Sequence, residues 1–188
     1  MGNVSVIAAN QFRPSGNYWT QITAPAVVKS SVGALCHVSV LAAGTGGGAL
    51  TFNDSNCLVT PQTITGITAA GPCVVTISTG GSANPFEPGN TVAFASVGGM
   101  TELNSLTSFV AAIGGVSGAW TVTVNIDSAS FSAYTSGGTI ASYSAANEIY
   151  TLPESSSLNA VSTVLALELP CSQGIICSAG LSVFEITL

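Results

Sequence analysis

The chain has 188 residues, of which 47% are hydrophobic and only 5% are charged. Two basic residues, Arg13 and Lys29, stand against eight acidic ones. The net charge is therefore −6, which excludes a partner that presents rows of phosphate, such as nucleic acid or an anionic membrane surface. The mean hydropathy of +0.57 excludes a disordered chain, and no apolar run approaches the roughly 18 residues that a membrane-spanning helix needs.

Alternation of apolar and polar residues with a period of two predicts half-buried strands along the chain. In chain order the strands are expected at Val4–Ala9, Leu35–Leu41, Ala49–Asp54, Cys73–Thr79, Asn90–Val97, Trp120–Asp127, Asn147–Pro153, Ser162–Leu169 and Leu181–Leu188. Gly, Pro, Asn and Ser punctuate them at short intervals. Helical signal is confined to Thr101–Phe109, which fits one turn. The predicted class is all-β, either a sandwich or a barrel.

Two segments predict domain junctions, Pro61–Cys73 and Ser136–Glu148. The stretch between them, residues 62–145, is compact, Gly-rich and dense in turns, and we interpret it as an insertion. Neither flanking piece has enough strands to close a sheet pair by itself. We therefore expect residues 1–61 and 146–188 to pair into one discontinuous β-sandwich of jelly-roll-like form.

The middle of the chain carries the combination GGMTELN (98–104) with AYTSGGT (133–139), after ITGITAAGPCVVTIST (64–79). This combination resembles a small β-module of tailed-phage structural proteins, which is itself similar to the first catalytic-cysteine half-domain of ubiquitin-activating enzymes. The resemblance covers residues 62–145 and implies a small β-barrel. It departs at the GGSANPFEP and GGVSGAW segments, which fit loops of different length. Only the fold is carried over, since fold alone does not define activity.

The outer pieces carry VVKSS (27–31), Asn53-Asp54 and AANEIYTLP (145–153). They resemble head-decoration and head-fibre proteins of phages. The resemblance implies a virion protein, assembled in the host cytoplasm, that cements a capsid as a homotrimer. Its implied partners are the major capsid protein and copies of itself. The alternative is a receptor- or glycan-binding module of a head or tail fibre.

Five cysteines leave at least one thiol unpaired within the chain. They are Cys36, Cys57, Cys73, Cys171 and Cys177. Their spacings contain no C-x-x-C pair and do not define a zinc site. Free, half-buried thiols are one interpretation. The others are a local bridge between Cys171 and Cys177 across an expected loop, and bridges between chains in the released particle.

No catalytic residues are predicted, and we expect no enzyme, cofactor or metal. His37 lies in a strand beside Cys36 but on the opposite face, so the two cannot act as a pair. The eight carboxylates are scattered along the chain, and the GTGGGA run (44–49) precedes a strand and fits a hairpin loop rather than a dinucleotide site. The aromatic residues that could form a subunit interface, a sugar-binding surface or part of the core are Tyr18, Trp19, Trp120 and Tyr134.

Overall fold

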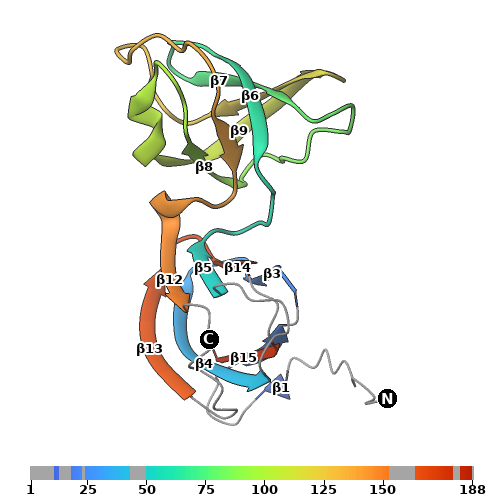
Figure 1. The fold of residues 1–188 in the computed structure, drawn as a ribbon, viewed down its shortest axis with the longest axis vertical. Helices are drawn as coiled ribbons and strands as arrows, with labels where there is room; N and C mark the ends of the chain where they lie inside the picture. Colours follow the sequence, from blue (N-terminus) through green and yellow to red (C-terminus); the bar gives the residue numbers. More distant parts are fainter. Residues whose placement is uncertain are drawn as a thin grey trace. The chain divides into compact units, whose positions relative to one another are not determined.

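The structure is a computed structural model that describes residues 11–12, 18–22, 24–42, 50–152, 164–179 and 183–187 (Figure 1). Apart from two short 3₁₀ helices, η1 (Thr101–Ser105) and η2 (Ala145–Asn147), its regular elements in these ranges are strands. The all-β prediction is confirmed. The chain forms two compact units, one of Met1–Asp54 with Ile149–Leu188 and one of Ser55–Glu148.

The first unit is built from two antiparallel sheets. One has the order β1 (Gln11–Phe12), β2 (Tyr18–Ile22), β15 (Val183–Thr187), β4 (Gly33–Ala42), β13 (Val164–Cys171), and the other has β12 (Glu148–Leu152), β5 (Leu50–Asp54), β14 (Ile175–Ala179), β3 (Ala26–Lys29). Strands from both sheets bury side chains in one cluster, which includes Leu35, Val38, Phe52, Ile175 and Cys177. The unit is therefore a β-sandwich, and its C-terminal strand β15 lies between β2 and β4.

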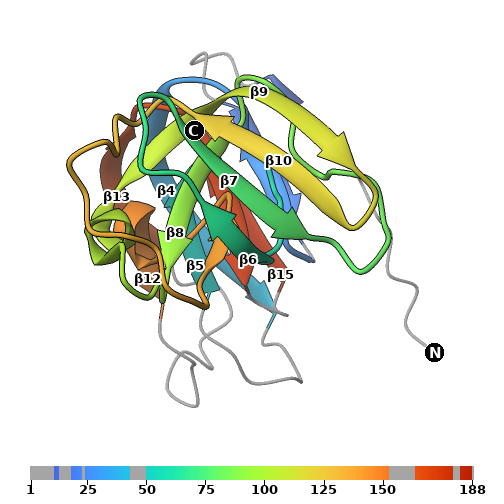
Figure 2. The ribbon, with the colours of Figure 1, turned by 90° about the horizontal axis from the view of Figure 1, so that it is seen from above.

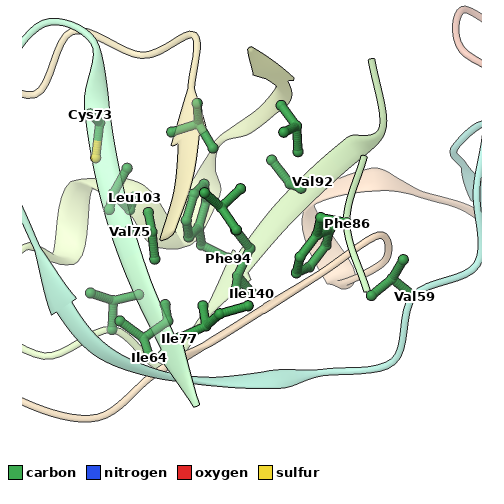
Figure 3. Close-up of a cluster of buried hydrophobic side chains, with 14 of the residues drawn as sticks. Val59, Ile64, Cys73, Val75, Ile77, Phe86, Val92, Phe94, Leu103 and Ile140 are labelled. Carbon is green, nitrogen blue, oxygen red and sulfur yellow. The ribbon is translucent and has the colours of Figure 1, made fainter. Parts of the chain in front are cut away.

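The second unit is a closed antiparallel barrel. Its strand order is β10 (Ala119–Val124), β7 (Cys73–Ser78), β6 (Gln62–Ile67), β11 (Thr139–Ala141), β8 (Thr91–Ala95), β9 (Thr107–Val116). On β7 and β10 alternate residues point inward, as Val122 and Val124 do on β10, both fully buried. Figure 3 shows Phe86, Phe94 and Ile140 directed into this core beside Val75 and Ile77.

Some elements differ from the sequence-based expectation. Strand β6 lies in the segment that was expected to be a junction, and the ten-residue strand β9 was not predicted. The inserted unit begins at Ser55 and ends at Glu148, against expected limits of 62 and 145. The strand expected at Val4–Ala9 and the loop at 44–49 lie outside the described residues.

A polar network fastens the two segments through which the chain enters and leaves the barrel. Buried Ser142 accepts a hydrogen bond from the Val59 N–H through its hydroxyl (2.8 Å), and the Ser142 N–H donates to the Val59 carbonyl (3.1 Å). The Asn147 amide donates to the Ser142 carbonyl (3.0 Å). On the entry segment, Asn56 Oδ1 accepts from the Thr91 N–H (2.9 Å). These bonds hold the entry and exit segments to the barrel, which explains why the barrel unit begins before β6 and ends after β11.

Replacing Ser142 tests this clamp. We expect Ser142→Ala to lower the free energy of unfolding of the barrel by about 1–3 kcal/mol, because the buried Val59 N–H loses its acceptor. Denaturant titration followed by tryptophan fluorescence measures the change. Ser105→Ala, at an exposed position of η1, is the matched control and should leave stability unchanged. A Ser142→Ala curve that overlays the wild type would contradict this role.

Candidate functional site

The two motifs that carry the resemblance lie against each other at one side of the barrel. The Gly98 N–H donates to the Ser136 carbonyl (2.9 Å) and the Thr135 N–H donates to the Gly98 carbonyl (3.0 Å). Gly99 has a φ of +80°, and a side chain there would collide with the backbone of Ala133 and Thr135. Glycine is therefore required where these two segments cross.

Three side chains of the motifs lock this crossing. Asn104 accepts from the Val97 N–H (2.7 Å) and donates to its carbonyl (3.1 Å). The Glu102 carboxylate accepts from the N–H and the hydroxyl of Ser132, both at 2.9 Å. The Tyr134 hydroxyl lies 3.1 Å from the carbonyls of Ile64 and Gly137. The hydrogen bonds of Ser132 lower the pKa of Glu102, which stays ionised at neutral pH.

These contacts give the motifs a structural role. Their amide, carboxylate and hydroxyl groups hold η1, the 131–136 segment and the start of β6 together. In the part of the chain that the structure describes, every buried side-chain nitrogen or oxygen has a hydrogen-bond partner. Among the same residues, no three His, Cys, Asp or Glu side chains gather as a metal site would require.

Two of the four aromatic candidates, Trp120 and Tyr134, have described side chains. Trp120 packs against the barrel core and its Nε1 donates to the Ser82 carbonyl (2.8 Å), while Tyr134 packs on the same core. Their polar atoms are thus engaged within the barrel. For Tyr18 and Trp19 only the backbone in β2 is described, and their side chains lie outside the described residues.

The five cysteines form no disulfide in the structure. Cys171 ends β13 and Cys177 lies within β14, so the expected loop between them is reduced to a three-residue turn, and both side chains are buried in the sandwich core. Cys73 is buried in the barrel core, and Cys57 packs against it. Burial raises the pKa of Cys57, Cys73 and Cys171, so these groups remain protonated thiols at neutral pH.

His37 and Cys36 do not form a catalytic pair. Both are half-buried on β4, where His37 pairs with Ala166 and Thr187 of the neighbouring strands. The Cys36 thiol faces the carbonyl of Ala34 at 3.9 Å. Strict alternation does not hold on this strand, since Leu35 and Val38 are both fully buried. A register shift in β13 between Ala166 and Leu169, opposite this point, accounts for the irregular burial.

One carboxylate organises a turn of the sandwich. Asp54, at the end of β5, accepts hydrogen bonds from the Ser172 N–H (2.9 Å) and hydroxyl (2.7 Å), and from the N–H groups of Gln173 (2.7 Å) and Gly174 (3.2 Å). Burial opposes ionisation of Asp54, but these four bonds outweigh it and lower its pKa. The carboxylate therefore holds the turn between β13 and β14.

The sequence-based reading missed an exposed apolar segment on β9. Phe109, Ile113 and Val116 are 39%, 42% and 69% exposed, and the Ala and Gly residues between them are exposed as well. We call Ala111–Val116 the β9 ribbon. Figure 2 shows β9 and β10 as long adjacent strands. Residues 103–126 contain no charged side chain, but neither do residues 55–86, so the absence of charge does not single out this segment in the sequence.

Comparison with known proteins supports the resemblance for the inserted unit. Residues 70–143 match the family described as ubiquitin-activating enzyme E1 FCCH domain. The match lies wholly within the barrel unit, Ser55–Glu148, and contains both motifs. No curated protein matches the chain. No helix among the described residues is long and apolar enough to cross a membrane.

We predict that the Asp54 carboxylate contributes stability that depends on pH. Its lowered pKa means that this contribution is present above the ordinary value of 3.8 and is lost as the pH falls through the pKa of the folded state. At neutral pH, Asp54→Asn should lower the free energy of unfolding by about 1 kcal/mol, because its amide group presents a donor to the turn and the site is partly solvated. The difference should shrink in acid. Denaturant titrations at several pH values measure it.

The exposed Glu168, in the same unit, provides the matched control. Glu168→Gln removes one negative charge without touching the turn and should leave the free energy of unfolding at neutral pH unchanged. An Asp54→Asn effect that persists undiminished in acid would contradict the assignment.

We predict that Cys73, Cys171 and Cys177 resist alkylation in the folded protein, because their side chains are only 0%, 3% and 1% exposed. Iodoacetamide labelling followed by peptide mass spectrometry measures each rate. Adding denaturant should make all three react, and half-buried Cys36 provides an internal reference. Rapid labelling of Cys73 without denaturant, or recovery of a disulfide-linked peptide, would show that the thiols are not held as described.

Proposed function

We propose that the chain is a structural protein of a tailed-phage virion that decorates and cements the capsid. The observation that carries this proposal is the use of the phage-module motifs: their polar groups are engaged in hydrogen bonds within the barrel unit that hold crossing segments together, which builds shape rather than chemistry. Such a module serves by presenting surfaces to neighbouring subunits. The first unit of the chain, a sandwich that both outer pieces build together, provides another surface of the same kind.

The composition suits this role. Because only 5% of residues are charged, contacts with neighbours desolvate few ions, which keeps the cost of burial low. Each buried Å² of apolar surface contributes about 25 cal/mol before ordering costs, and standard interfaces bury about 1,600 Å² in total. Several such contacts per subunit would stabilise a shell against rupture.

The proposed partners are the major capsid protein and further copies of the chain, in a homotrimer within the virion. A fibre module that binds glycans is the alternative, and the described aromatic side chains give it no support. Trp120 and Tyr134 contribute to the packing of the barrel rather than to an open platform.

Particle composition and stability test the proposal. We expect quantitative mass spectrometry of purified virions to find the chain in many copies, on a scale with the major capsid protein. Particles that lack it should release their genome at a lower temperature, because shell contacts are missing, and addition of the purified chain should restore the wild-type release temperature. Buffer alone is the control. A few copies per particle, or unchanged heat stability without the chain, would overturn the cementing role.

A further inference from the structure

A segment outside the strands supplies one of the largest side chains of the barrel core. Residues 80–88 lie between β7 and β8, and we call them the strap. Phe86 of the strap is fully buried in the same cluster as Val59 and Val92 (Figure 3). Of the other strap residues, Asn84 is half-buried and the rest are exposed. The strap is therefore fixed to the core by a single side chain.

Few hydrogen bonds hold the strap to the strands of the barrel. The Trp120 Nε1 donates to the Ser82 carbonyl (2.8 Å), and the Asn84 amide donates to the Thr121 carbonyl (3.3 Å). Both bonds use a side chain as the donor. Among the described residues, no backbone group of the strap bonds to the backbone of a barrel strand. The strap can therefore leave without breaking any strand pairing of the barrel.

Two further bonds of the strap are local. The Phe86 N–H donates to Asn84 Oδ1 (3.1 Å), and the Glu87 N–H donates to Asn90 Oδ1 (2.8 Å). Each joins residues two or three positions apart, and single bonds of this kind contribute little net stability in water. The closed position of the strap therefore depends chiefly on the buried ring of Phe86.

Glycines lie at both ends of the strap. Gly81 has a φ of +91°, and Gly89, directly after the strap, has a φ of +89°. A side chain would be strained at such values, which glycine adopts at little cost. Apart from its chain neighbours, no atom lies within 4 Å of the point where a side chain would begin at either glycine. Neither end is thus held by packing, and both are suited to the dihedral changes of a hinge.

We propose that the strap is a hinged plug, which opens about Gly81 and Gly89 and withdraws Phe86 while the strands of the barrel stay paired. Local opening needs less free energy than unfolding where few buried contacts are broken. The open state presents Phe86 and the apolar space that the ring leaves, both of which the closed barrel hides. Opening is a property of the isolated chain and does not depend on the proposed assembly role.

Native-state hydrogen exchange followed by mass spectrometry tests the opening in the wild-type chain. The Phe86 and Glu87 amides should exchange faster than those of β7 and β10. Low concentrations of denaturant should barely change the strap rate, because opening exposes little surface, whereas they should accelerate exchange in the two strands. Equal rates with equal denaturant dependence in the strap and in both strands would overturn the proposal.

Phe86→Ala separates a plug from a merely exposed loop. Because burial of a phenyl ring no longer favours the closed state, strap exchange should rise about tenfold to a hundredfold. Phe109→Ala makes the same change at a barrel residue that is 39% exposed, and it should leave strap exchange unchanged. A folded Phe86→Ala variant with the wild-type strap rate would show that the ring does not hold the strap closed, and would overturn the proposal.

Trp120→Phe takes the place of Phe86→Ala if that variant does not fold. It removes the bond to the Ser82 carbonyl and keeps an aromatic ring on β10. Strap exchange should rise about threefold or more, because one of the two bonds to the strands is lost. An unchanged strap rate in this variant would count against the hinged plug in the same way.

Discussion

The central constraint in this chain is that the inserted barrel must start and finish at neighbouring points. Val59 and Ser142 lie far apart in sequence, yet their backbones and the Ser142 hydroxyl are joined by hydrogen bonds in a buried setting. Asn147 and Asn56 extend this clamp along the exit and entry segments. With both ends held, the barrel is fixed as a separate unit, and the outer pieces are left to pair with each other.

Closure of the barrel also depends on local contacts, namely the close approach of two backbone segments. The Gly98-Gly99 pair allows the 133–136 segment to pass at a distance that no side chain would permit, and Gly138 also lies close to Val97. Asn104 and Glu102 then satisfy backbone groups that the crossing leaves unpaired. The motifs that mark the resemblance are thus the residues without which the crossing segments could not approach. This explains how a recognisable sequence signature can exist without a catalytic purpose.

The sequence predicted those strands whose two faces differ. On β10, Val122 and Val124 face the core and Thr121 and Thr123 do not, which gives a clear alternation. Strand β9 could not be predicted, because a run of Ala and Gly that is exposed on both faces has no alternation. The turn held by Asp54 was also hidden, since its partners lie 118 to 120 residues away. Nor could spacing show that Cys171 and Cys177 lie on two strands, because the turn between them is so short.

The β9 ribbon differs from the rest of the described fold. Among the described residues, buried polar side chains are paired, the motif groups are engaged, and the described aromatic side chains of the barrel pack on its core. The β9 ribbon departs from this pattern, being extended, apolar and uncharged where an edge strand ordinarily carries protection.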